Sequence, residues 1–265
     1  MNLGAMHNTP GDVGSYGLLY QWGRKDPFPA APTLTGTTAT VGAPIYDGDN
    51  NEIKITNSSQ SSTADNNLAF AIANPTVCLS NYAQFNTSRD WLQADMSNDA
   101  LWGNPKGAER NETNDFLNKG AKSFYDPCPV GWRVPPADVF RNFTASGGYA
   151  WVIDDFDIAD ISGDGAKSLA DYDYGWTFNL SDSASSYFPA AARFDGSYAM
   201  LMGSMSGLWG SYWGNAPYPG DMFQGGAYSV LSFQIKDTAG NEMITTSPAG
   251  GGARADAYSV RCIRG

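Results

Sequence analysis

Apolar residues in this chain occur in short runs, and Gly, Asp, Asn, Ser and Pro separate one run from the next. This pattern is typical of many short strands joined by turns and loops. In residues 14–30, an apolar and aromatic run stops at two prolines, which predicts a strand followed by an extended loop. We expect further short strands at residues 149–153, 174–180, 185–194, 227–235 and 257–263.

A polar segment and a helical pattern interrupt this series of strands. Residues 31–67 are rich in Thr, Ser, Asn and Gly, and we interpret them as an insertion or surface lobe. Within them, apolar residues on either side of a DGDNN turn at 47–51 predict a hairpin. The best helix candidate is 136–145, where prolines precede a segment with apolar residues on one face.

The composition favours one α+β domain over residues 1–265, with few short helices, many short antiparallel strands and long loops. Hydrophobic residues make up 42% of the chain, enough for a core, while 30 Gly and 15 Pro argue against a helical bundle. The net charge of −11 opposes nucleic-acid binding, because a duplex partner requires a basic surface. No apolar run reaches the ~18 residues of a membrane span, so we expect no membrane insertion.

Cysteine and histidine are scarce, which limits the chemistry available to the chain. The three cysteines, at 78, 128 and 262, allow one disulfide and one spare thiol. Cys78 alternates with apolar neighbours, so we expect a buried core thiol and not a nucleophile. The single histidine, His7, cannot complete a standard zinc site with these cysteines and could serve a catalytic triad only as its base. We therefore expect no metal, no cofactor and no catalytic residues.

Acidic residues concentrate at 154–173, in the sequence DDFDIADISGDGAKSLADYD. A calcium loop alternates oxygen ligands and ends in a bidentate Glu. Asp155 and Asp157 fit this spacing, but the next acid is Asp160 and no Glu closes the loop. We interpret the run as a solvated acidic loop, and calcium binding stays open as an alternative.

Residues 207–228 combine six aromatic residues with six glycines and one charge. Trp and Tyr give large contact areas for few frozen torsions, and recognition surfaces combine them with Gly, Ser and Asn. Trp209 and Tyr228 flank strand-like segments, so we expect them in the core. The residues between them lie in turn-like sequence, which predicts a contact surface, although their rings could instead be core. The expected contacts are Tyr212, Trp213, Asn215, Tyr218, Asp221, Phe223 and Gln224.

A series of short motifs spans nearly the whole chain. The two most specific are YDPCPVGWRVP at 125–135 and YSVRCIRG at 258–265. The others are NLGA at 2–5, GLLYQWGRKDPFP at 17–29, NPTVCLS at 74–80, WL at 91–92, LWGN at 101–104, GWTFN at 175–179, SYFPAAARF at 186–194, YW at 212–213 and AYSVLSF at 227–233. In this order, the motifs resemble the family called the Fibrobacter succinogenes major paralogous domain.

This resemblance implies a C-type-lectin-like fold and a location outside the cytoplasm, on the surface of Bacteroidetes bacteria, including at pilus tips. It also implies that the end of the chain returns near its middle, so we predict a disulfide between Cys128 and Cys262. The chain begins at NLGA, so we expect a missing first strand or upstream domains. After Gly207 it departs from the family's short YWSSS-like segment. C-type-lectin-like proteins diversified by retroelements vary in this region, which predicts variable positions within 207–256.

We expect a ligand-binding domain and not an enzyme. It would belong to a surface adhesin or pilus-tip protein that recognises a protein or glycan on another cell or host surface, with pilus subunits as further partners. Two alternatives stay open. One is a glycosidase-like surface enzyme using two acids from 154–173, which would have to face each other at ~5–9 Å. The other is a structural subunit whose aromatic residues are buried against a neighbouring domain.

Overall fold

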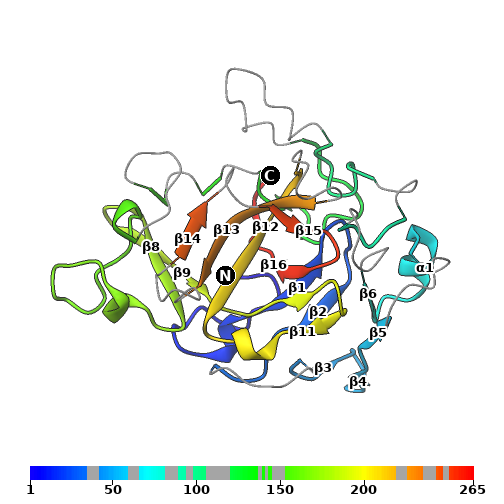
Figure 1. The fold of residues 1–265 in the computed structure, drawn as a ribbon, viewed down its shortest axis with the longest axis horizontal. Helices are drawn as coiled ribbons and strands as arrows, with labels where there is room; N and C mark the ends of the chain where they lie inside the picture. The colour runs from blue at the N-terminus through cyan, green and yellow to red at the C-terminus, as the bar shows by residue number, and fades with distance from the viewer. Residues whose placement is uncertain are drawn as a thin grey trace.

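The structure is a computed structural model that describes residues 1–34, 42–58, 66–80, 89–93, 98–105, 120–136, 139–140, 143–144, 153–218, 226–234, 243–246 and 251–265. These residues form mostly antiparallel strands with few short helices (Figure 1). At this coarse level the expected organisation of short strands and long loops is confirmed. Within the described residues, no helix combines the length and the apolar character needed to cross a membrane.

A curled sheet of nine strands organises the described part of the chain (Figure 1). The strands are β1 (Leu18–Gln21), β2 (Pro27–Pro29), β10 (Phe194–Asp195), β11 (Met200–Leu201), β12 (Trp209–Pro217), β13 (Gly226–Gln234), β14 (Met243–Thr246), β15 (Gly251–Ala253) and β16 (Ala257–Ser259). The main order is β11-β10-β16-β12-β13-β14, while β1 pairs with β16 and β2, and β15 pairs with β13. The β12–β16 contact is parallel and the other pairs are antiparallel.

Two-stranded ladders and short helices surround this sheet. The ladders pair β3 (Ile45–Tyr46) with β4 (Glu52–Ile53), β5 (Thr56–Ser58) with β6 (Val77–Leu79), β7 (Trp132–Arg133) with β17 (Ile263–Arg264), and β8 (Gly175–Ser181) with β9 (Ala184–Pro189). The helices are α1 (Leu68–Ala73) and the 3₁₀ turns η1 (Val13–Ser15), η4 (Ile153–Asp155), η5 (Leu169–Asp171) and η6 (Gly203–Met205). In the view of Figure 1, α1 lies to the right of the sheet and the β8–β9 ladder to its left.

Most of the predicted strands are present where the structure describes them, but Ile153, the described end of the predicted strand 149–153, lies in the turn η4. The run in 14–30 forms β1, and the segment after it pairs back as β2 instead of staying a loop. The predicted hairpin forms as β3 and β4. Its turn is fixed by the Asp47 carboxylate, which accepts the N–H groups of Asp49 and Asn51 at 2.9 and 2.8 Å. Strands β8, β9, β13 and β16 lie in or beside the other predicted segments, and residues 149–152 lie outside the described residues.

The helix α1 was not predicted, because it follows directly after the polar residues assigned to the surface lobe. Its N-terminus is capped by Asn67, whose side chain accepts the N–H of Phe70 at 2.8 Å. Asn74 ends it, with its N–H bonded to the carbonyl of Phe70 at 2.9 Å. Six residues are too few for an isolated helix to be stable, so contacts with the rest of the chain must hold α1 in place.

The helix predicted at 136–145 falls partly outside the described residues. The described ones make i→i+3 bonds, from Val139 N to Pro136 O at 3.3 Å and from Phe143 N to Phe140 O at 3.0 Å. These bonds indicate tight turns at the described positions. The apolar face that suggested a helix is nevertheless buried, since Phe140 and Phe143 are 5% and 6% exposed.

Three clusters of buried side chains form the core of the described residues. The first gathers tryptophans from distant segments: Trp22, Trp91, Trp102 and Trp213. The second is built around Phe156, Trp176, Phe178, Phe188, Tyr212 and Phe233, and the third around Tyr16, Leu19, Phe28, Phe194 and Leu201. Large aromatic side chains bury much apolar area per residue, which stabilises a fold whose strands are short.

The two ends of the chain meet at the sheet. Leu3 N donates to Val260 O at 2.8 Å, and β1 pairs with β16. The predicted disulfide between Cys128 and Cys262 is confirmed, with Cα atoms 5.9 Å apart. Beside it, β7 pairs with β17, so the last residues are held against the middle of the chain both covalently and by a strand ladder.

Cys78 carries a free, buried thiol, as predicted. Burial raises the pKa of this thiol to about 12, and the thiolate is the reactive form. At pH 8 the folded chain should therefore hold roughly a thousandfold less thiolate than the unfolded chain. We expect iodoacetamide to label Cys78 in urea within minutes and to leave it unmodified in the folded protein, as measured by mass spectrometry. Equal labelling rates in the two states would contradict this prediction.

Candidate functional site

The expectation that Tyr212, Trp213 and Asn215 are exposed contacts is wrong. Tyr212 and Trp213 are fully buried and Asn215 is 1% exposed. Strand β12, which carries all three, lies between β13 and β16 in the sheet. Successive side chains of a strand point to opposite faces, so Tyr212 joins the phenylalanine-rich cluster and Trp213 joins the tryptophan-rich cluster. These rings therefore belong to the core.

Hydrogen bonds explain why these polar side chains tolerate burial. Trp213 Nε1 donates to Tyr20 O at 2.7 Å, and the Tyr212 hydroxyl donates to Pro189 O at 2.8 Å. Asn215 Oδ1 accepts from the side-chain amide of Asn104 at 2.9 Å. The three side chains thus connect β12 to neighbouring segments and are not available to a ligand.

The other predicted contacts have different outcomes. Tyr218 is half-buried, while Asp221, Phe223 and Gln224 lie outside the described residues. Trp209, expected in the core, is also half-buried, and the Arg193 guanidinium lies 4.6 Å from its ring centroid. The predicted contact surface is therefore not assembled by the residues that the structure describes.

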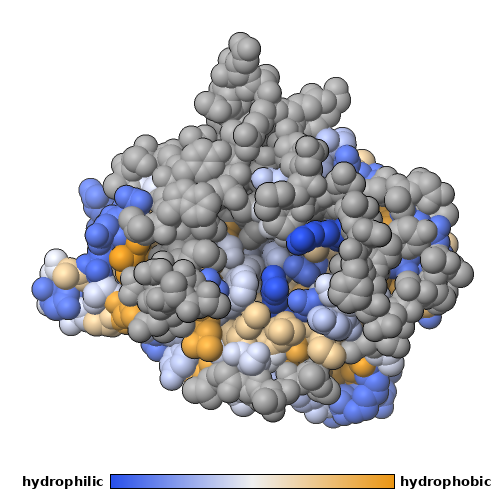
Figure 2. All heavy atoms as spheres, viewed as in Figure 1, coloured by the Kyte–Doolittle hydropathy of each residue, from blue (hydrophilic) through white to orange (hydrophobic). Residues whose placement is uncertain are grey.

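The acidic loop at 154–173 uses its carboxylates to bind its own backbone. Asp160 accepts the N–H groups of Gly163 and Gly165 at 2.6 and 2.9 Å, and Asp171 accepts that of Ser162 at 3.0 Å. Figure 2 shows hydrophilic residues gathered over this loop, at the left of the view. Within the described ranges, no three His, Cys, Asp or Glu side chains come together as a metal site.

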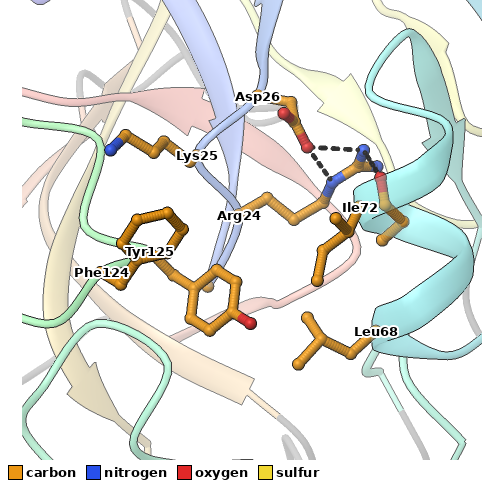
Figure 3. Close-up of a pocket in the computed structure, with 9 residues that line it drawn as sticks. Arg24, Lys25, Asp26, Leu68, Ile72, Phe124 and Tyr125 are labelled. Atoms are coloured by element: carbon orange, nitrogen blue, oxygen red, sulfur yellow. Dashed lines mark hydrogen bonds and ion pairs between the residues drawn. The ribbon is translucent and has the colours of Figure 1, made fainter.

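A small pocket lies between three segments that are far apart in the sequence (Figure 3). Its volume is about 130 Å³. The turn after β1, helix α1 and the loop before the disulfide supply its lining: Gly23, Arg24, Lys25, Asp26, Leu68, Ala71, Ile72, Phe124 and Tyr125. The lining combines aliphatic and aromatic side chains with a few charged groups, as in many ligand sites.

Arg24 fixes the relative position of two walls of this pocket. It is 2% exposed, and its Nη2 donates to Asp26 Oδ2 at 3.0 Å and to the carbonyls of Ala71 and Asn74 at 3.4 Å. The last two carbonyls belong to the C-terminal end of α1, where a cation is favourable. Its Nη1 donates to Val77 O at 2.6 Å. Arg24 thus ties the short helix to the turn after β1.

Gly23 allows this turn to pass close to its neighbours. Its φ of +87° is a conformation that favours glycine. A Cβ at this position would lie 2.4 Å from Leu101 Cδ1. The GLLYQWGRKDPFP motif therefore requires glycine where it turns into the pocket wall.

Phe124 and Tyr125 form the wall opposite α1. Their rings meet edge to face with centroids 5.7 Å apart, and Lys25 Nζ lies 4.9 Å from the Phe124 ring centroid. Tyr125 packs against the tryptophan-rich cluster, whereas Phe124 is 80% exposed. On the other wall, Ile72 is 58% exposed. Two large apolar side chains therefore remain in solvent at the mouth of the pocket.

The backbone that carries this aromatic pair is well anchored. The Asp126 carboxylate accepts the N–H groups of Cys128 and Val134 at 2.8 and 3.0 Å and pairs with Lys122 at 2.8 Å. Ser123 donates to Leu101 O, and the disulfide follows at Cys128. A pre-formed site loses less entropy when a ligand binds, and this frame provides such a site.

The lining of the pocket supports contact better than catalysis. Among the described residues that line the pocket, Asp26 alone carries a carboxylate, and Arg24 holds that group in an ion pair at 3.0 Å. A glycosidase requires two carboxyl groups on either side of the scissile bond. The described lining therefore does not supply such a pair, and the glycosidase alternative would have to use acids of 154–173.

Sequence reasoning missed this pocket because its walls come from three separate segments. One usable signal is the pair Phe124-Tyr125. These two successive aromatic residues form a turn before the DPCP segment. Turns lie at the surface, so one of the two rings is expected to be exposed, and Phe124 is that ring.

No family model, curated protein sequence or solved structure matches this chain. Disulfides such as the one between Cys128 and Cys262 form and persist in oxidising compartments. What the structure defines is a mostly antiparallel arrangement of short strands, with a disulfide and a pocket between the turn after β1, helix α1 and the loop before the disulfide.

Proposed function

We propose that this chain is the C-type-lectin-like ligand-binding domain of a bacterial surface adhesin or pilus-tip protein, and not an enzyme. The observation that carries this proposal is the exposure of Phe124 and Ile72 at the mouth of an anchored pocket. Exposed apolar side chains around a concave site are typical of binding surfaces. The ligand is a protein or glycan on another cell.

Further features support this function. The two most specific motifs, around Cys128 and Cys262, hold the disulfide and the β7–β17 ladder, so the resemblance rests on residues that shape the fold. The disulfide supports a location outside the cytoplasm. The proposed diversification of residues 207–256 remains part of this hypothesis. The buried side chains of Tyr212, Trp213 and Asn215 restrict such variation to other positions of that range.

A binding assay on cells and arrays tests the proposal. Fluorescently labelled protein of residues 1–265 should bind saturably to intact bacterial or host cells, or to arrayed glycans or extracellular proteins. Phe124→Ala should weaken that binding, because it removes an exposed ring from the mouth of the pocket. No saturable binding on any of these surfaces would reject the proposal. Release of reducing sugar from arrayed glycans would instead establish the glycosidase alternative.

A further inference from the structure

We propose that the pocket binds one apolar side chain of an extended protein segment that carries an acidic residue beside it. This inference rests on the proposed binding function and names the class of ligand for its site. Figure 3 shows the arrangement: Phe124 and Lys25 lie on one side of the pocket, and Leu68 and Ile72 of α1 lie on the other.

The size of the pocket suits a single side chain. Its volume is about 130 Å³, and a cavity of roughly 150 Å³ lined by apolar residues accommodates benzene. A branched aliphatic side chain or a phenyl ring therefore fits. Sites for whole small-molecule ligands are larger, about 300–1,000 Å³. A side chain that projects from an extended segment can enter the pocket while the rest of the segment stays outside.

The chemistry of the walls favours an apolar group over a sugar ring. Leu68, Ala71, Ile72, Phe124 and Tyr125 supply apolar contact. A sugar ring has several hydroxyls, and each one that is buried must find a hydrogen-bond partner. Arg24 donates to protein acceptors at Asp26, Val77 and α1, and Asp26 Oδ2 accepts two of those bonds. The Arg24 guanidinium and the Asp26 Oδ2 oxygen are thus already engaged within the protein.

The charge at the mouth favours an acidic neighbour in the ligand. Lys25 is exposed, and its Nζ lies over the Phe124 ring. Its neighbour Asp26 pairs with Arg24 instead, and Lys25 takes part in no ion pair among the described residues. A carboxylate next to the inserted side chain would meet this cation while both remain near water. Such a contact adds specificity and association rate more than affinity.

Because the residues to be changed are exposed, the variants can test binding without altering the stability of the fold. Phe124→Ala removes the ring at the mouth, and Lys25→Glu reverses the charge. Both residues are largely exposed, so the thermal midpoint should be unchanged. Matched controls are Val130→Ala, an apolar residue that is 96% exposed and not part of the lining, and Lys54→Glu, whose side chain is 73% exposed.

The experiment is selection of a phage-displayed random heptapeptide library on immobilised protein of residues 1–265. The enriched peptides are then synthesised, and their dissociation constants are measured by fluorescence anisotropy. We expect a consensus of one large apolar residue within two positions of Asp or Glu. Phe124→Ala should weaken binding of these peptides roughly tenfold, as at a central contact, and Lys25→Glu should weaken it less, mainly through slower association, whereas the two controls should bind like the wild type.

Three results would overturn the inference: no enrichment, a consensus without the apolar and acidic pair, or peptide binding that Phe124→Ala and Lys25→Glu leave unchanged. If the wild type nevertheless binds cells or glycans, the proposed function stands and only the assignment of the ligand fails. Glycan binding that depends on Phe124 would place a sugar in the pocket in place of the peptide.

Discussion

Replacing Trp213 by alanine should lower the free energy of unfolding by about 3–5 kcal/mol, the range for truncating a large buried aromatic side chain. Trp213 is fully buried. Its ring stacks on Tyr258 with centroids 4.1 Å apart, and its Nε1 donates to Tyr20 O at 2.7 Å. Alanine would leave a cavity between β1, β12 and β16 and would remove the donor from a buried carbonyl. Urea unfolding followed by circular dichroism measures the loss.

This substitution also separates the two readings of the aromatic stretch. If Trp213 were a surface contact, alanine would reduce binding and leave stability unchanged. Trp132→Ala is the matched control, because Trp132 lies in β7 and is 45% exposed. We expect a clearly smaller loss of stability for Trp132→Ala. Equal losses for the two variants would contradict the placement of Trp213 in the core.

The burial of Tyr212 and Trp213 could not be predicted from the sequence around them. Aromatic residues mixed with Gly, Asn and Pro occur both in contact loops and in central strands with tightly packed neighbours. The neighbours decide between these cases, and they are remote in the sequence. Tyr20 lies 193 residues before Trp213. The ring centroid of Phe188 lies 5.2 Å from that of Tyr212, and Phe188 belongs to β9 in the separate β8–β9 ladder. Neither contact can be predicted from the residues near Tyr212 and Trp213 in the sequence.

The sequence was sufficient to predict an element whose stabilising hydrogen bonds lie within the element itself. The hairpin of β3 and β4 follows from a turn in which Asp47 binds the next residues of the same turn. Helix α1 is the opposite case. Its C-terminal carbonyls accept hydrogen bonds from Arg24, which precedes Ala71 by 47 residues. The sequence of 68–73 alone therefore does not predict this stabilising contact.

The candidate pocket shows the same limit. Its walls come from the turn at 23–26, from α1 and from Phe124-Tyr125, and only the fold brings them together. The predicted disulfide is a long-range contact that local patterns could not supply, because the resemblance behind it relates distant motifs to one another. The resemblance brought the Cys128 and Cys262 motifs together, and the disulfide joins them.

Removal of this disulfide is expected to destabilise the domain by about 4–5 kcal/mol, the loop-closure value for a loop of this length. The two cysteines are 134 residues apart, so the bridge restricts the unfolded chain strongly. The folded state keeps noncovalent contacts at the same place: β7 pairs with β17, and Gly265 N donates to Gly131 O at 2.9 Å. The variant Cys128→Ala/Cys262→Ala should therefore retain the native circular dichroism spectrum while its urea midpoint falls.

Reduction provides the control for this prediction. Wild-type protein unfolded and refolded with a phosphine reductant should match the double variant, and the double variant should not respond to the reductant. A loss below about 1 kcal/mol would mean that the unfolded chain is already compact without the bridge. Because the net stability of a domain is typically about 5–15 kcal/mol, a loss of about 4–5 kcal/mol would remove about a quarter or more of it. The chain would then be considerably more stable in an oxidising compartment, which gives the proposed location outside the cytoplasm a thermodynamic basis.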